Sequence, residues 1–333
     1  MKPVIIIAIA FVLLFSLVST TSLAFGESIP SWVKNIFVWY AEDKIDEDEL
    51  LSALQYLVNS KIITSDGKQI VRDNITSIFA HTIKDNGDFY VTYEENPNSN
   101  YELSVKDMFQ EAEWFEHDIQ YLNSNFKLPY DVEIVVKECN TPNAFYNHQT
   151  KQIIMCYEFV ERVNSDYVTY YGKQSLVNEH GIFIADENFL LSDVTYWVFY
   201  HEVGHALSTI YGLPYTGLRE NVADQFASYI VLVETEFDGE EKTNYIQDMM
   251  INVGTWFFIL ESSGQEHIFW DTHNLSIQRF YNISCYVYGN NPQYTSWLVT
   301  DEWLPQKRAD SCAYEYSVLE DSWTRLLAPY RIG

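Results

Sequence analysis

Apolar residues along the chain follow two spacings, and each spacing predicts a different kind of element. Short runs rich in β-branched and aromatic residues predict strands at 89–93, 131–138 and 152–157, the last two paired with each other. Apolar residues three or four positions apart predict helices at about 104–123, 193–211, 218–233, 245–260, 277–288 and 314–327. Because strands come first and mainly helices follow, the pattern predicts an α+β fold.

The first residues have the pattern of a signal peptide. Lys2 precedes an apolar run at 4–18, and the small residues Ser22 and Ala24 suit positions −3 and −1 of a cleavage site. The run is shorter than the ~20 apolar residues that span a bilayer, and no later stretch of the sequence is long enough either. We therefore expect residues 1–24 to be removed on export to a secreted or extracellular location. An uncleaved membrane anchor is the alternative.

Residues 25–68 predict a separate helical module. Apolar residues recur at helical spacing on both sides of an acidic link at 43–49, which indicates a helical hairpin. The letters IPSWVKN at 29–35 and QYL at 55–57 resemble a short module of exported archaeal proteins. Binding of a cell-surface partner by this module is a further hypothesis. A polar boundary follows, so we expect residues 69–333 to form the main domain.

The cysteines and the net charge indicate the cellular location of the protein and the partners that it can bind. Four cysteines suit an exported protein, and of the three pairings that they allow, Cys139–Cys156 with Cys285–Cys312 is favoured because each pair brackets one local unit. The net charge of −27, from 47 acidic and 20 basic residues, would repel nucleic acid and anionic membranes. We therefore expect no nucleic-acid partner, and membrane contact only through an uncleaved N-terminal segment.

The pentapeptide HEVGH, from His201 to His205, carries the clearest chemistry. It lies in a predicted helix that Ser192 or Asp193 can cap. Histidines four positions apart share one face of a helix, where both imidazoles can bind one Zn²⁺. Glu202 lies about 100° around the helix, close to the metal without binding it, and can accept a proton from water as general base. Two neighbouring core histidines are the alternative.

The next predicted helix supplies carboxylates at the same spacing. Glu220 and Asp224 are four positions apart, and fourteen residues separate His205 from Glu220, enough for a turn that brings the two helices together. Glu220 would be the third ligand, leaving an open fourth position. Asp224 would accept the free N–H of a ligand histidine and fix its tautomer. An exposed acidic helix face is the alternative.

This arrangement, H-E-x-x-H followed by E-x-x-x-D, resembles the gluzincins, the thermolysin-like superfamily of zinc metallopeptidases. Asn143 and Ala144, in the letters NAFY, resemble the segment of the edge strand whose main chain pairs with an extended substrate in that superfamily. An ordinary turn after Pro142 is the alternative. The resemblance implies a zincin-like fold with a small twisted sheet, an edge strand over the cleft, the HExxH helix and a helical C-terminal part.

Three further stretches resemble a family of exported H-E-x-x-H metallopeptidases, mostly bacterial, whose function is not established. They lie at 138–158, 270–285 and 304–329, and with the two zinc helices they span roughly residues 80–330. The family has two cysteines in each flanking block, in agreement with the local pairing.

Residues after the zinc helices complete the expected site. Gluzincins place a His or Tyr donor there for the oxyanion that forms during hydrolysis, and His273 is the best-placed candidate. Asp271, two residues earlier, would orient it, whereas a structural histidine beside Trp270 is the alternative. Arg279 is expected to be structural or to bind a substrate carboxylate.

These residues together predict a secreted zinc-dependent endopeptidase acting on a peptide or protein substrate, with Zn²⁺ on His201, His205 and Glu220. Two alternatives stay open. One is a non-catalytic extracellular surface protein with a structural zinc site, against which an intact Glu202 argues. The other is an amidase or esterase that uses the same centre.

Overall fold

The computed structural model describes Tyr40 and residues 83–94, 99–172, 190–234, 240–264 and 272–332. The chain divides into two compact units, residues 1–74 and 75–333, and every element named below belongs to the second. The predicted signal peptide and almost all of the predicted helical module lie outside the described residues. The boundaries predicted for them remain predictions.

A four-stranded mixed sheet forms the N-terminal part of this unit. Its strands are β1 (Phe89–Tyr93), β2 (Val132–Lys137), β3 (Ala144–Asn147) and β4 (Gln152–Cys156), in the spatial order β1-β2-β4-β3. The first three in that order run parallel to one another, and β3 pairs antiparallel with β4 from Ala144 opposite Met155 to Asn147 opposite Gln152. The sheet therefore ends on β3, which is an edge strand.

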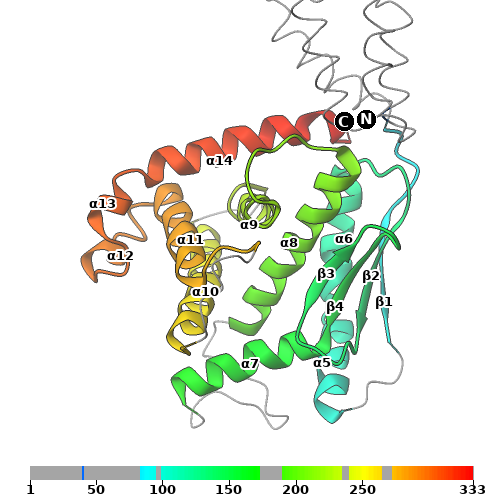
Figure 1. Cartoon of the computed structure of the whole chain (residues 1–333), viewed down its shortest axis with the longest axis horizontal. Helices are drawn as coiled ribbons and strands as arrows, with labels where there is room; N and C mark the ends of the chain where they lie inside the picture. Colours follow the sequence, from blue (N-terminus) through cyan, green and yellow to red (C-terminus); the bar gives the residue numbers. More distant parts are fainter. Residues whose placement is uncertain are drawn as a thin grey trace, which may run out of the picture. The chain divides into compact units, whose positions relative to one another are not determined.

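Helices make up most of the rest. They are α5 (Asn100–Glu111), α6 (Trp114–Asn125), α7 (Tyr157–Tyr171), α8 (Leu190–Tyr211), α9 (Arg219–Tyr229) with the π-helical turn η1 (Ile230–Glu234), α10 (Glu240–Ser262), α11 (Ser276–Asn290), α12 (Trp297–Thr300), α13 (Gln306–Ala309), α14 (Cys312–Leu327) and the 3₁₀ turn η2 (Ala328–Tyr330). Helix α8 contacts β3 and β4 as well as α9 and α10, so it lies between the sheet and the later helices (Figure 1). The predicted α+β class with a small sheet is confirmed.

Helix α8 is a core helix and is buried along nearly its whole length. Its described part already includes Leu190, so the predicted caps lie inside the helix. Asp193 is buried there and accepts a hydrogen bond from Asn252 Nδ2 at 2.7 Å. The helix ends where Gly212 adopts a left-handed conformation, with φ of 58°, and the amide of Leu213 donates to the carbonyl of Ser208.

One predicted helix is divided in two. Instead of a single helix at about 104–123, α5 and α6 are separated at Glu113, whose φ of 47° is left-handed and cannot continue a helix. Helix α5 begins earlier than predicted because Ser99 and Glu102 form a capping box. Helix α7 was not predicted at all; it follows β4 without a loop.

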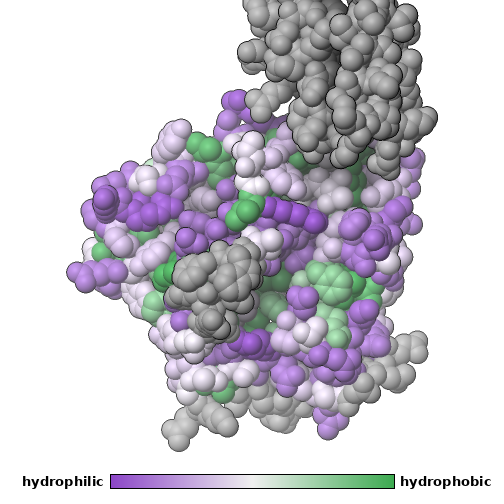
Figure 2. Space-filling model, viewed as in Figure 1, coloured by the Kyte–Doolittle hydropathy of each residue, from purple (hydrophilic) through white to green (hydrophobic). Residues whose placement is uncertain are grey.

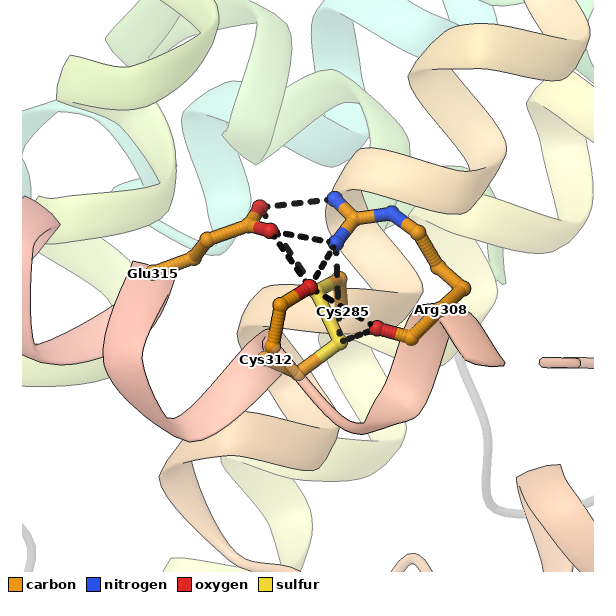
Figure 3. Close-up of a disulfide and its surroundings, with 5 residues drawn as sticks. Cys285, Arg308, Cys312 and Glu315 are labelled. Atoms are coloured by element: carbon orange, nitrogen blue, oxygen red, sulfur yellow. Dashed lines mark hydrogen bonds and ion pairs between the residues drawn. A yellow bond between two sulfur atoms is a disulfide. The ribbon is translucent and has the colours of Figure 1, made fainter. Parts of the chain in front are cut away.

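Two disulfides tie helices and strands together, and both are the pairs expected from the sequence. Cys139, just after β2, is joined to Cys156 at the end of β4, and Cys285 of α11 is joined to Cys312 at the start of α14. Beside the second disulfide, Arg308 donates to both carboxylate oxygens of Glu315, at 2.6 and 2.7 Å (Figure 3). This end of α14 is therefore held to α11 by a covalent bond and braced by an ion pair.

The described surface is mainly hydrophilic on the face that Figure 2 shows. Hydrophilic residues cover most of the face in Figure 2, with small separate hydrophobic patches between them. Among the described residues, no helix combines the length and the apolar character that a membrane span needs.

Helices α11 and α14 approach each other so closely that one glycine has no room for a side chain. A Cβ atom at Gly289 would lie 2.3 Å from the carbonyl oxygen of Cys312. We predict that Gly289→Ala lowers the free energy of unfolding by about 1–3 kcal/mol, because the backbone of α14 must shift.

Gly254→Ala is the matched control, because the atoms nearest to its Cβ would lie at 3.6 Å or more. Alanine is the better helix former by about 1 kcal/mol, so this variant should be as stable as the wild type or more so. Denaturant unfolding of the oxidised proteins measures both. Equal losses in the two variants would contradict the close approach.

Candidate metal centre

Helix α8 places the residues of the HEVGH motif around a buried point. His201, Glu202 and His205 are 4, 5 and 7 % exposed, and the imidazole rings of the two histidines lie 4.7 Å apart between their centroids. Gly204 faces α9, where a Cβ atom would lie 3.0 Å from the side chain of Phe226. The lack of a side chain at this position lets α9 come close to the histidines.

Helix α9 brings two carboxylates to these histidines. Glu220 Oε2 lies 3.2 Å from His201 Nε2 and 3.0 Å from His205 Nε2, and Asp224 Oδ1 lies 2.7 Å from His201 Nδ1. The two ring nitrogens of His201 therefore face different carboxylates, one on each turn of α9. The structure brings together all four side chains as the spacing of the sequence predicted.

The donor atoms fit a zinc ion. One ligand atom from each of His201, His205 and Glu220 lies within 4.8 Å of the others. Ligands of a tetrahedral Zn²⁺ with bonds of about 2.0–2.1 Å lie about 3.4 Å apart, close to the two nitrogen–oxygen distances above. Two imidazoles and one carboxylate are also a donor set that catalytic zinc sites use, with a fourth position open.

Behind the histidines, Asp224 is held by a guanidinium group. Arg279 donates from Nε to Asp224 Oδ2 at 2.8 Å and from Nη2 to Asp224 Oδ1 at 2.6 Å. The guanidinium carbon lies 4.0 Å from the ring centroid of Phe257 and 5.5 Å from that of Trp197. These contacts, with a side chain only 14 % exposed, favour a positioning role for Arg279 over the predicted contact with a substrate carboxylate.

The same contacts shift the pKa values of His201 and Glu220. Burial lowers the pKa of His201, but hydrogen bonds to Asp224 and Glu220 outweigh it and raise the pKa to about 9. Burial opposes the charged form of Glu220, yet hydrogen bonds from His201, His205 and His273 hold its pKa well below the usual range. Because a metal binds neutral imidazole, metal binding must release a proton from His201, and affinity should fall as the pH falls.

The Glu202 side chain points toward the sheet and not toward Glu220 and Asp224. Its Oε2 accepts a hydrogen bond from the backbone amide of Tyr146 in β3 at 2.8 Å. Alternate residues of a strand direct their polar groups to the same side, so the amide and carbonyl of Ala144 also face the open side of β3. Asn143 is exposed, and its carbonyl accepts from the amide of Cys156 on the paired side.

His273 reaches the site from the segment before α11. Its Nε2 lies 3.0 Å from Glu220 Oε2, and its side chain is 44 % exposed. It does not belong to the group of His201, His205 and Glu220, whose donor atoms are mutually close. Asp271, predicted to orient it, lies outside the described residues.

Sequence reasoning missed two features of this site. The amide of Tyr146 is a backbone group, and no residue type signals where such a group points. Arg279 was noticed, but its partner Asp224 is 55 residues away in the sequence, and only the folded structure reveals the contact.

The chain thus folds as an α+β protein in which two histidines and a glutamate converge at a point that could hold a metal ion. Residues 93–327 match the model of a protein family described as "Putative metallopeptidase", and the chain belongs to this family. A metallopeptidase requires a metal ion, and His201, His205 and Glu220 could hold one. Searches of curated proteins and of solved structures found no match to the chain.

We predict that the protein binds about one zinc ion per chain. His205→Ala should abolish this binding and Glu220→Ala should weaken it strongly, because each variant removes one of three converging donors. Elemental analysis and competition with a chromogenic chelator measure occupancy and affinity.

Asp224→Asn is the informative comparison, because Asp224 contacts a ligand and is not expected to be one. Loss of such a partner typically lowers metal affinity by about 10–100-fold while the site can still be filled at high zinc. Full zinc affinity in Glu220→Ala would show that the third ligand lies elsewhere, with Asp224 the first to test.

Proposed function

We propose that this protein is a zinc-dependent endopeptidase that hydrolyses peptide bonds, with Glu202 as general base. The observation that carries the proposal is the position of Glu202. This carboxylate is buried beside the two histidines, yet it stands apart from the donor group and faces the edge strand β3. A site that held metal only for structure would have no use for a base in this position.

Zinc bound to His201, His205 and Glu220 would supply a Lewis acid that polarises the scissile carbonyl and lowers the pKa of water. Glu202 would accept a proton from the attacking water and deliver it to the leaving amine. His273, half exposed at the edge of the site, would donate a hydrogen bond to the developing oxyanion. The Asp224–Arg279 pair would hold His201 in one tautomer and orientation.

The edge strand suggests how a peptide is held. The polar groups of Ala144 face the open side of β3, where an extended substrate could pair with them as an added strand. Main-chain pairing of this kind holds a peptide without reading its side chains, so a broad peptide substrate class is proposed. Asn143, exposed at the start of the strand, would contact the substrate next to this pairing.

Export is part of the proposal. Two disulfides are typical of proteins that mature in an oxidising compartment. Together with the N-terminal sequence pattern, they support secretion of the mature chain.

Glu202→Gln tests the mechanism. The glutamine oxygen can still accept from the Tyr146 amide, so we predict unchanged zinc content and thermal stability. Turnover should fall about 10²–10⁴-fold, because the side chain no longer accepts a proton. Cleavage of a mixed peptide library by zinc-loaded protein, followed by mass spectrometry, measures turnover.

A wild-type protein that is loaded with zinc, cleaves nothing in the library and behaves as Glu202→Gln does would contradict the peptidase proposal. The non-catalytic protein with a structural zinc would then be the better account. Cleavage of simple amides or esters without cleavage of peptides would point to the amidase or esterase.

His273→Ala separates three roles for this histidine. If His273 donates to the oxyanion, the variant should lose about 10²–10³-fold in kcat, with KM nearly unchanged and zinc retained. Loss of zinc in the variant would instead make it a ligand, and loss of stability with full activity of the folded fraction would make it structural. His273→Gln, which keeps an N–H donor, should recover part of the activity only in the first case.

A further inference from the structure

A pocket lies between α6, α8 and η1, and none of the candidate metal ligands lines it. Its volume is about 390 Å³, within the range of about 300–1,000 Å³ that is typical of small-molecule sites. Helix α6 contributes Asp118 and Tyr121 to its walls, helix α8 contributes Tyr196 and Tyr200, and η1 contributes Glu234. The pocket therefore combines aromatic rings with two carboxylates.

One of these carboxylates already has a cationic partner within the chain. Glu234 Oε1 lies 2.5 Å from Nη2 of Arg331, and the hydroxyl of Tyr229 donates to the same oxygen. Glu234 Oε2 accepts from the hydroxyl of Tyr121 at 3.0 Å. The charge of Glu234 is therefore balanced, and both of its oxygens have hydrogen bonds.

The other carboxylate is more deeply buried and has only tyrosine partners. Asp118 is 8 % exposed, and its Oδ1 accepts from the hydroxyl of Tyr200 at 2.9 Å. Within the described part of the chain, no lysine, arginine or histidine forms an ion pair with Asp118. Burial raises its pKa to about 7, although hydrogen bonds from Tyr200 and Tyr196 lower it. Because a buried carboxylate is usually paired with a cation, Asp118 favours a positively charged ligand in this pocket.

The walls of the pocket indicate an organic cation and not a metal ion. Tyr196 and Tyr200 lie four positions apart on α8, and their ring centroids are 5.0 Å apart. An aromatic ring attracts an ammonium group that lies within about 6 Å of its face. Ca²⁺ needs about six to eight oxygen ligands, whereas Asp118 is the one carboxylate lining this pocket that is not paired with an arginine. An ammonium group also needs fewer acceptors than a guanidinium group does.

We propose that this pocket binds the ammonium group of an organic amine, with Asp118 as its counter-ion and Tyr196 and Tyr200 as its aromatic walls. The amine is either a free small molecule or the lysine side chain of a polypeptide, since both carry the same alkylammonium group. Because the candidate metal ligands do not line the pocket, the proposal does not depend on peptidase activity.

Calorimetric titration of the full-length protein with n-butylammonium chloride, at an ionic strength held constant with NaCl, tests the proposal. We expect saturable binding of about one ion per chain. n-Butanol has the same carbon chain without the charge and should bind at least about 10-fold more weakly, because it cannot form a charge-assisted hydrogen bond to Asp118. This comparison needs only the wild-type protein.

A second ligand distinguishes the two sources of the amine. Nα-acetyl-lysine methylamide carries the same alkylammonium group on a peptide backbone. Tighter binding of this compound than of n-butylammonium would identify a polypeptide lysine as the ligand, and weaker binding would identify a free amine.

Asp118→Asn removes the charge and keeps an oxygen that can accept from the Tyr200 hydroxyl. The variant should bind n-butylammonium about 10–100-fold more weakly. Without ligand it should be at least as stable as the wild type, because an ionised group without a cation is costly to bury. Asp107→Asn, on the exposed face of α5, is the matched control and should bind as the wild type does. n-Butylammonium should raise the Tm of the wild type and of the control but not of Asp118→Asn.

Three results would overturn the proposal. The first is a wild-type protein that shows no saturable binding of n-butylammonium, or that binds n-butanol equally well. The second is undiminished binding by Asp118→Asn, which would place the amine elsewhere in the protein. The third is an equal loss of binding in Asp107→Asn and Asp118→Asn, which would indicate attraction to the acidic surface as a whole.

Discussion

The close packing of α8 against α9 determines whether this chain can hold a metal at all. The histidines and the carboxylates come from two helices, and each pair is aligned only by the helical spacing of its own helix. Gly204 has no side chain at the contact between the two helices, and the side chain of Phe226 occupies this space. Phe226 is itself buried against Trp323 of α14, with ring centroids 5.2 Å apart. The separation of the metal donors is thus set by packing that extends into the last helix of the chain.

Helix α11 connects this packing to His201, a predicted metal ligand. It carries Arg279, which fixes Asp224, and Cys285, which is bonded to α14. The two contacts link α11 to α9 and to α14. Arg279 also offsets the negative charge of the site, because Glu220 and Asp224 both lie beside the buried His201. This guanidinium group is therefore part of what allows two carboxylates to lie on either side of one imidazole ring.

Local spacing explains what could be predicted from the sequence. The positions of His201, His205, Glu220 and Asp224 follow from the period of a helix, and the disulfides follow from short sequence separations. The break at Glu113 could not be predicted, because the left-handed residue is a glutamate, which carries no signal for that conformation. Helix α7 was missed because it continues β4 without an intervening turn. Sheet order and the contact of Arg279 with Asp224 depend on long-range packing, which no local pattern encodes.

The edge strand β3 and the candidate metal centre are linked by Glu202. An edge strand leaves every second amide and carbonyl without a partner in the sheet, and a buried amide of this kind must find one elsewhere. At Tyr146 the partner is the Glu202 carboxylate, so β3 helps to fix the position of the proposed base. The neighbouring polar groups of Ala144 remain directed to the same open side. A peptide that paired with Ala144 would therefore lie next to the Glu202 carboxylate, and the proposed substrate binding and proton transfer would then depend on the same strand.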